Sequence, residues 1–428
     1  MRKSNTMLSA LAITTVLGFT AAACGSSKTT TTTTGSSATT ASGAATTAVA
    51  TTIAAGSATT GAGTATTAGG TATTAGGTAT TGGSTGSSTG STAGATGSPL
   101  DPATVTACEV TDTGGVDDKG FNQSAYSGVT TAATKLGTKS DLLESKTDAD
   151  YAPNIQSFLS KKCTVIITVG FNLDSATATA AKANPKQQFA IIDSTAKDNN
   201  GTPDDPTDDK ALPNVRPLLF NTADPSFMAG YLAAGMTKTG TVATYGGIDI
   251  PPVDIFMTGF LNGVNYYNTV KKTTVKVLGW DGKTGSFAGD FKSLDKGTSL
   301  AQGFADEGAD IVFPVAGGVG LGTAAYALQS GKISVIGVDT DQYVSNPQDK
   351  SVYLTSVLKH VDNAVFDTVQ NIVKTGKPGA SYLGTLANDG VGLADYHDFA
   401  SKVPKALQDE LTQIKADLIS GKIKSVKS

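Results

Sequence analysis

The sequence contains few of the residues on which nucleic-acid binding and most catalytic sites depend. Lys and Arg number 32 against 36 Asp and Glu, so the net charge is −4, and no basic run stands out. A nucleic-acid-binding surface has a concentrated basic footprint, so we expect no nucleic-acid partner. The two histidines, His360 and His397, fit neither a Ser/His/Asp order nor a metal-binding spacing. We therefore expect no enzyme, no cofactor and no metal site.

Cysteine is also scarce, and the first of the three cysteines follows a targeting segment. Arg2 and Lys3 precede the apolar stretch Leu8–Phe19, which is too short to span a membrane. Ala21–Ala23 then lead into Cys24, an arrangement that resembles a bacterial lipobox. We expect a signal peptide over residues 1–23 and a lipid on Cys24, which would anchor the protein to the extracytoplasmic face of the cell membrane. The alternative is an ordinary secretory signal.

Large side chains are nearly absent from residues 24–98, where Thr, Ala, Gly and Ser dominate. Such a stretch buries too little apolar surface to offset the loss of chain entropy, so we expect a disordered tether. The remaining residues, 99–428, have a mixed apolar and polar pattern and the length of about two domains.

Short apolar strands alternate with amphipathic helices through this region, and the alternation restarts after about residue 228. This pattern is typical of α/β proteins in which helices cover both faces of a parallel sheet. We expect two lobes, at about 104–220 and 221–350, with closing segments at 351–428 and a ligand in the cleft between the lobes. A polar loop at Asp198–Lys210 is predicted as a solvated insertion, with a cation-binding loop as the alternative.

The two remaining cysteines are predicted to form a disulfide. Cys108 lies in the first strand and Cys163 immediately precedes the third. In a 2-1-3 strand order these strands are parallel neighbours, about 4.8 Å apart, which suits the usual Cα separation of a bridge. We expect the bond at the end of the lobe away from the ligand.

Polar residues gather where the predicted strands end. The segment TDTGGVDDKGFNQSAYSG, Thr111–Gly128, follows the first strand, and other strands end in single polar or glycine residues. Because carboxyl ends of parallel strands meet at one edge, we expect a site for a small polar ligand there. The candidate residues from these strand ends are Asp112, Phe121, Asn122, Asp193, Gly317, Asp339 and Lys359. For Asp117 and Asp118, helix capping is the alternative.

Five segments in order resemble the basic membrane protein family of bacterial lipoproteins, which are substrate-binding subunits of ABC importers and include purine nucleoside receptors. They are TDTGGVDDKGFNQSAYSG, MAGYLAAGMTKTGTVATYGGIDIPP, DIVFPVAGGVGLG, VIGVDTDQ and LTSVLKHVD. The resemblance implies a two-lobed periplasmic-binding-protein type I fold, a monomer, a nucleoside ligand, and permease and ATPase partners.

The resemblance also implies roles for individual residues. Phe121 and Phe287 would sandwich the base, with Asn122 beside Phe121. Asp193 would recognise the base edge, and Asp339 and Lys359 would hold ribose hydroxyls. The insertion Asp198–Lys210 follows Asp193 closely and departs from the family pattern.

Two other functions remain open from the sequence. Calcium-dependent nucleoside hydrolases have a DTDPGxDD motif, but here Val110 stands at the first Asp position, and the pair Asp117 and Asp118 is displaced by one residue. A surface sensor that uses the same binding fold would have the same anchor and tether.

Overall fold

The computed structural model describes residues 98–202 and 206–426. The predicted signal peptide, Cys24 and nearly all of the predicted tether lie outside the described residues. No helix in the described part of the chain is long and apolar enough to cross a membrane.

The first lobe is built on a parallel six-stranded sheet with the order β2-β1-β3-β4-β5-β11. The helices α1 and α9 cover one face and α2 and α3 the other. The strands are β1 Thr106–Val110, β2 Lys139–Leu143, β3 Val165–Val169, β4 Gln188–Ile192, β5 Val215–Phe220 and β11 Tyr382–Gly384. The helices are α1 Phe121–Leu136, α2 Tyr151–Lys161, α3 Asp174–Ala183 and α9 Val361–Thr375.

The second lobe repeats this strand order as β7-β6-β8-β9-β10, with β12 added antiparallel to β10. Its strands are β6 Thr241–Gly246, β7 Lys276–Leu278, β8 Ile311–Val315, β9 Ser334–Asp339, β10 Tyr353–Lys359 and β12 Val391–Leu393. Its helices are α4 Ala223–Met236, α5 Pro251–Lys271, α6 Leu294–Asp306, α7 Val319–Ser330, α8 Gln342–Ser345 and α10 Lys405–Ile419. Short 3-10 helices lie at Pro102–Thr104, Asp148–Asp150, Phe171–Leu173, Pro206–Asp208, Lys350–Val352, Leu386–Asn388 and His397–Phe399.

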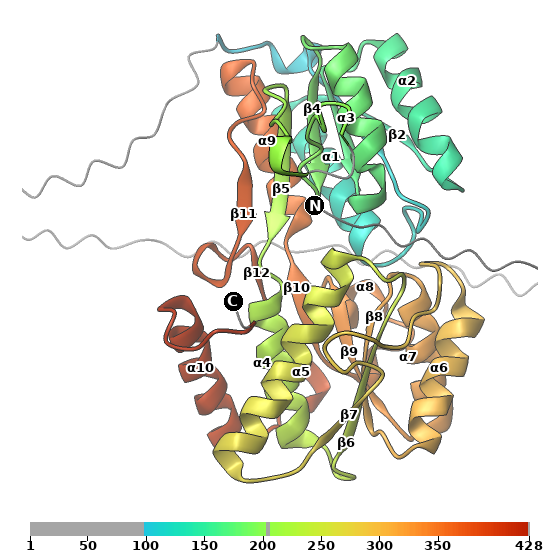
Figure 1. Cartoon of the computed structure of the whole chain (residues 1–428), viewed down its shortest axis with the longest axis vertical. Coiled ribbons are helices and arrows are strands. Elements are labelled where there is room, and N and C mark those ends of the chain that lie inside the picture. The colour runs from blue at the N-terminus through green and yellow to red at the C-terminus, as the bar shows by residue number, and fades with distance from the viewer. Residues whose placement is uncertain (1–97, 203–205, 427–428) are drawn as a thin grey trace, which may run out of the picture. The chain divides into compact units, whose positions relative to one another are not determined.

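The residues after about 350 are divided between the lobes. Figure 1 shows β11 and α9 with the first sheet and α10 beside α4 at the second. The described chain passes between the sheets from β5 to α4, from β10 to α9, and from β11 to β12. These connections are where we expect the lobes to hinge.

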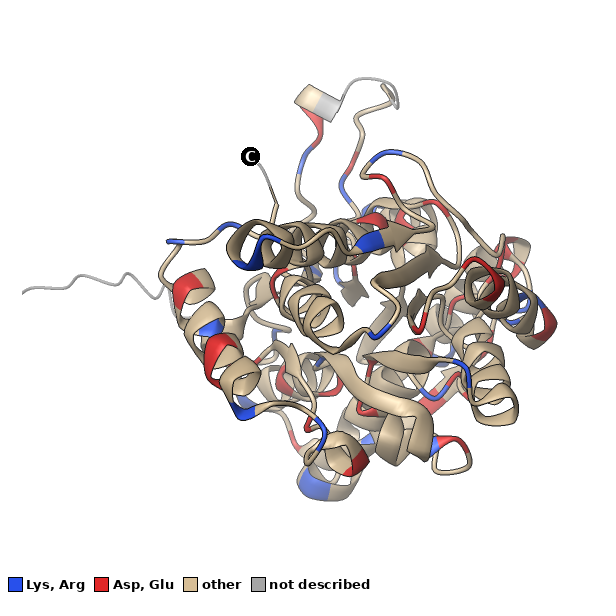
Figure 2. Ribbon diagram, turned by 90° about the horizontal axis from the view of Figure 1, so that it is seen from below, with Lys and Arg blue, Asp and Glu red and all other residues tan. Residues whose placement is uncertain are grey.

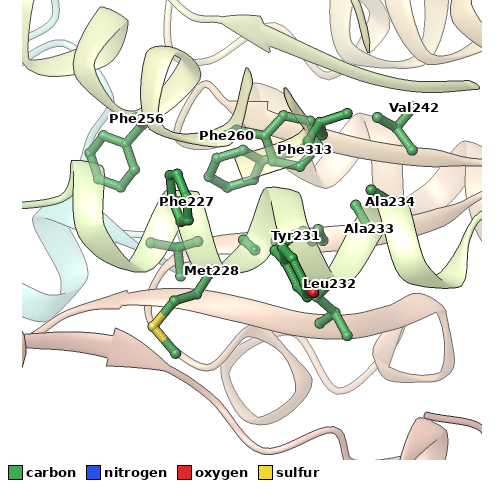
Figure 3. Close-up of a cluster of buried hydrophobic side chains, with 14 of the residues drawn as sticks. Phe227, Met228, Tyr231, Leu232, Ala233, Ala234, Val242, Phe256, Phe260 and Phe313 are labelled. Atoms are coloured by element: carbon green, nitrogen blue, oxygen red, sulfur yellow. The ribbon is translucent and has the colours of Figure 1, made fainter. Parts of the chain in front are cut away.

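Helix α4 is buried on nearly all sides, because it lies between α5, α10 and the second sheet. The rings of Phe227 and Tyr231 both contact Tyr266 of α5. Phe260 of α5 packs against Phe313 of β8 (Figure 3). Helix α4 begins at Ala223, before the restart of the alternation predicted after about residue 228, because a helix that is apolar all round lacks the periodic pattern that marks its ends.

Cys108 and Cys163 form a disulfide, with their Cα atoms 6.1 Å apart. β1 and β3 are parallel neighbours in which Ala107 pairs with Val165. Because Cys163 immediately precedes β3, the bond lies away from the carboxyl ends of the strands, as the strand order predicts.

Asp198 and Lys210 form an isolated antiparallel bridge at the base of the predicted loop, and Asp198 pairs with Lys182 at 2.8 Å. Among the described residues, no group of three His, Cys, Asp or Glu side chains is arranged to hold a metal ion.

Candidate functional site

One pocket lies at the carboxyl ends of the strands and takes residues from both lobes. It encloses about 600 Å³ of empty space, part of it open to solvent. Its lining includes Asp112, Phe121, Asn122, Asp193, Gly317, Asp339 and Lys359, so the structure brings together seven of the eight predicted contact residues. Residues from both lobes line the pocket because the carboxyl ends of the strands in both sheets face the same space.

The equivalent fourth strands, β4 and β9, each end in an aspartate with an unusual backbone. Asp193 has φ of 63° and Asp339 has φ of 68°. A non-glycine residue in this left-handed region is strained, and such strain gathers at functional sites. The two aspartates thus adopt the same backbone conformation at corresponding strand ends of the two lobes, and both line the pocket.

Lys359 is the central cation of the pocket and has only 2% of its side chain exposed. Its ammonium donates a hydrogen bond to the Asp193 carboxylate, which belongs to the other lobe. It also lies over the rings of Phe121, Phe220 and Phe256, at 4.4, 5.3 and 5.7 Å from their centroids. Cation–π contacts and the ion pair together offset the cost of burying this charge.

The buried carboxyls outnumber this lysine. Burial, opposed by the Lys359 charge and reinforced by the negative charges of Asp193, Asp118 and Asp112, raises the pKa of Asp339 to about 7. Burial also raises the pKa of Asp112 to about 6, although Asn122 and the Gly114 N–H donate hydrogen bonds to it. The pocket thus concentrates hydrogen-bond acceptors, which suits a ligand rich in hydroxyl or amino donors.

Asp118 both lines the pocket and caps α1. Its carboxylate accepts hydrogen bonds from the backbone N–H groups of Gly120, Asn122 and Gln123. Asp117, in contrast, is exposed and pairs with Lys119. Because Asp118 caps α1 and Asp117 is exposed, the two carboxylates do not form the cluster of a calcium-dependent hydrolase.

Phe287, the second predicted aromatic residue, is not among the residues that line the pocket. Its ring packs against Trp280 at 6.1 Å between centroids and fills the space that a side chain on Gly246 would need. Phe291, four residues later, lines the pocket instead. The Asp290 carboxylate accepts N–H bonds from Lys292 and Ser293, and this turn carries Phe291 over the bare backbone of Gly247.

Sequence reasoning also missed Phe171, Asn172 and Phe256, which line the pocket. Phe171 and Asn172 follow Gly170 at the end of β3, so the same strand-end argument could have found them. Phe256 lies inside α5, where one aromatic residue among several gives no sequence signal for a ligand contact.

Two similar α/β lobes with a polar, aromatic pocket between them define the periplasmic-binding-protein class of fold. Solved structures with this fold include an ABC transporter solute-binding protein from Aeropyrum pernix K1, with a TM-score of 0.63 and 23% identity, covering 75% of this chain and 92% of that one. Another, from Conexibacter woesei DSM 14684, has a TM-score of 0.54 and 18% identity, covering 75% and 98%.

The chain belongs to the Bmp family of PnrA-like ABC transporter substrate-binding proteins, whose model matches residues 105–427. It is 32% identical to the "ABC transporter nucleoside-binding protein BmpA" of Lactococcus lactis subsp. cremoris, over 74% of this chain and 88% of the relative. It is 33% identical to a "CD4+ T-cell-stimulating antigen" of Listeria monocytogenes, over 74% and 87%. Its function is therefore substrate binding for an ABC transporter.

Proposed function

We propose that the pocket binds a purine nucleoside. The observation that carries this proposal is the pairing of one aromatic ring from each lobe, Phe121 and Phe291, with buried carboxyls and Lys359 at the strand ends. Aromatic stacking holds a flat base with little dependence on its identity, at about 1–3 kcal/mol per base. The nucleoside-binding name of the Lactococcus lactis relative supports the same ligand class.

In this arrangement the base stacks between Phe121 and Phe291, on the face of Phe121 not occupied by the Lys359 ammonium. Asp339 accepts hydrogen bonds from the ribose hydroxyls, and Lys359 donates to them from its place beside Asp193. Asp193, at the end of β4, is also placed to accept from donors on the base edge. Each such charged hydrogen bond is worth about 1.5–3 kcal/mol.

Calorimetry with adenosine, guanosine, their free bases and ribose tests this proposal. Asp339→Ala should weaken both nucleosides by about 1.5–3 kcal/mol while leaving the free bases nearly unchanged. Phe291→Ala should weaken nucleosides and bases alike, whereas Phe287→Ala should leave the contacts to the base in place. Failure of the wild-type protein to bind any nucleoside would end the assignment of the ligand and leave the substrate-binding function standing.

We also propose that Cys24 carries lipid after signal cleavage and holds the protein on the extracytoplasmic face of the membrane, where a monomer delivers ligand to permease and ATPase subunits. The sequence around Cys24 and relatives named as lipoproteins support this location. A Cys24→Ser variant should move from the membrane fraction to the soluble fraction or the medium. Unchanged membrane fractionation would contradict the anchor.

A further inference from the structure

A contact between the lobes beside the pocket involves residues to which the family resemblance assigns no role. The Lys119 carbonyl, in the turn before α1, accepts hydrogen bonds from the hydroxyls of Thr340 at 2.7 Å and Ser345 at 2.8 Å. These hydroxyls lie 3.0 Å from each other. Lys119 belongs to the first lobe, whereas Thr340 and Ser345 flank the start and end of α8 in the second.

We propose that Thr340, Ser345 and the Lys119 carbonyl form a catch that holds the lobes closed over the ligand and positions the turn that carries Phe121 and Asn122. The proposal rests on the proposed function in one respect, because its effect on ligand release requires a ligand in the cleft. The catch itself forms whenever the lobes meet, so it also protects the turn in protein without added ligand.

The backbone of Lys119 supports this role. Its φ of 56° lies in the left-handed region, which is unfavourable for a non-glycine residue. Such a conformation persists where the surroundings hold it. Within the turn, the Asp118 carboxylate accepts hydrogen bonds from the N–H groups of Gly120, Asn122 and Gln123. From the other lobe, the hydroxyls of Thr340 and Ser345 donate hydrogen bonds to the Lys119 carbonyl.

The catch is adjacent to the ligand contacts on both lobes. Lys119 is two residues before Phe121, and Thr340 directly follows Asp339. At Gly120, an added Cβ would lie 3.7 Å from the Val338 carbonyl and 3.8 Å from the Asp339 carboxylate, so the gap between the lobes there is about one methyl group wide. Loosening the catch would therefore displace a ring and a carboxyl that face the ligand.

The catch also differs from the ion pair between Lys359 and Asp193, which links the lobes inside the pocket. Thr340 and Ser345 do not line the pocket, so replacing them removes no side chain that contacts the ligand. This separation makes the catch testable without changing the ligand contacts themselves.

The test compares the full-length protein with the variant Thr340→Val, Ser345→Ala. Two measurements are made: the association and dissociation rates of guanosine, and hydrogen exchange of the backbone amides in residues 118–123 without added ligand. We expect about tenfold faster dissociation and about tenfold faster amide exchange, as the loss of two ordinary hydrogen bonds permits. The association rate should stay within about twofold, because encounter occurs with open lobes.

A matched control is Thr269→Val, Ser299→Ala. Both residues are exposed and lie in the second lobe, as Thr340 and Ser345 do. The hydroxyl of each donates a hydrogen bond of 2.8 Å to a carbonyl of its own helix. The control should behave as wild type in both measurements, and Thr340→Ser, which keeps a hydroxyl, should stay close to wild type.

If the amides of residues 118–123 exchange in the double variant at the wild-type rate, the catch is contradicted. An unchanged dissociation rate would also contradict it. If the wild-type protein binds no nucleoside, the proposed function fails, and the exchange measurement alone decides whether the catch holds the turn. The single variants Thr340→Val and Ser345→Ala give the same readout if the double variant does not fold.

Discussion

At the scale of single residues, the crowding of carboxyls around Lys359 makes ligand binding sensitive to pH. Asp339 has a pKa raised to about 7, by burial and by Asp193, Asp118 and Asp112, so it carries a proton through much of the mildly acidic range. A protonated carboxyl accepts hydrogen bonds from ribose hydroxyls more weakly than a carboxylate does.

We therefore expect nucleoside affinity to be highest above about pH 7 and to fall on acidification. One proton linked to binding gives at most about a tenfold loss per pH unit. Calorimetric dissociation constants between pH 8.5 and pH 5.5 measure this slope, and Asp339→Asn should remove the step near pH 7. A flat profile for the wild-type protein would show that Asp339 does not accept from the ligand in its ionised form.

Glu109 is a buried carboxyl that the site does not use. It lies in β1 with no exposed surface, and neither of its carboxylate oxygens has a hydrogen-bond partner. Burial, with a contribution from the nearby charge of Asp118, raises the pKa of Glu109 well above its ordinary value. The folded state therefore holds a proton that the unfolded state releases at about pH 4.3, so stability falls as pH rises above that value.

Glu109→Gln should cancel this loss. The difference in unfolding free energy between variant and wild type should grow in favour of the variant from pH 4 upward, by at most about 1.4 kcal/mol per pH unit. Urea denaturation at several pH values measures this difference. Glu307→Gln, at an exposed glutamate, is the control and should show little change. A constant difference across the range would show that Glu109 ionises normally.

At the scale of elements, α4 and α5 pack so closely that glycine is required between them. A Cβ on Gly263 of α5 would lie 1.9 Å from the Phe227 carbonyl oxygen of α4, and one on Gly230 would lie 2.0 Å from the Phe260 carbonyl oxygen. Backbone atoms of a buried helix cannot move aside locally, so an added methyl must separate the helices.

Gly263→Ala should lower the unfolding free energy by more than about 2 kcal/mol, because it overpacks this helix crossing. Gly303→Ala in α6 is a matched control, since a Cβ there meets nothing within 4 Å. The control should gain about 0.5–1 kcal/mol from the better helix propensity of alanine. Thermal or urea unfolding of both variants checks the contrast, and equal stabilities would contradict the close crossing.

The predicted strands and helices do not decide which of two aromatic residues, Phe287 or Phe291, lines the pocket. Both rings lie in the connection between β7 and α6, and the family resemblance favoured Phe287 as the ligand contact. The bare backbone at Gly246 and Gly247 gives each ring a place to pack, and the Asp290 turn sends the second ring into the pocket. Strands and helices were predictable from periodicity, but this choice depends on packing between distant residues.

At the scale of the whole molecule, the disulfide ties β1 to the residue before β3 across a sequence separation of 55. Closing a loop of this length restricts the unfolded chain by about 4 kcal/mol in the chain-entropy model. Cys108→Ala, Cys163→Ala should therefore lower the unfolding free energy by up to about that amount, as measured by urea denaturation followed by circular dichroism. Free thiols in the secreted wild-type protein would mean that the bond does not form.

Charge across the molecule agrees with a small-molecule ligand. Over the described residues, Lys and Arg are interspersed with Asp and Glu on the elements visible in Figure 2. The composition predicted the small net charge of −4, whereas the spatial mixing of the two signs depends on the fold.

The sequence by itself determined the repeated strand and helix order, the edge at which polar residues gather, and the pairing of Cys108 with Cys163. These features follow from local periodicity and from the geometry of neighbouring parallel strands. Only the tertiary structure decided that Lys359 pairs with Asp193, that Phe291 and not Phe287 lines the pocket, and that the Lys119 carbonyl meets Thr340. The first and last of these contacts join opposite lobes, and the Phe291 contact depends on close packing over glycine, so no local pattern in the chain encodes the distances involved.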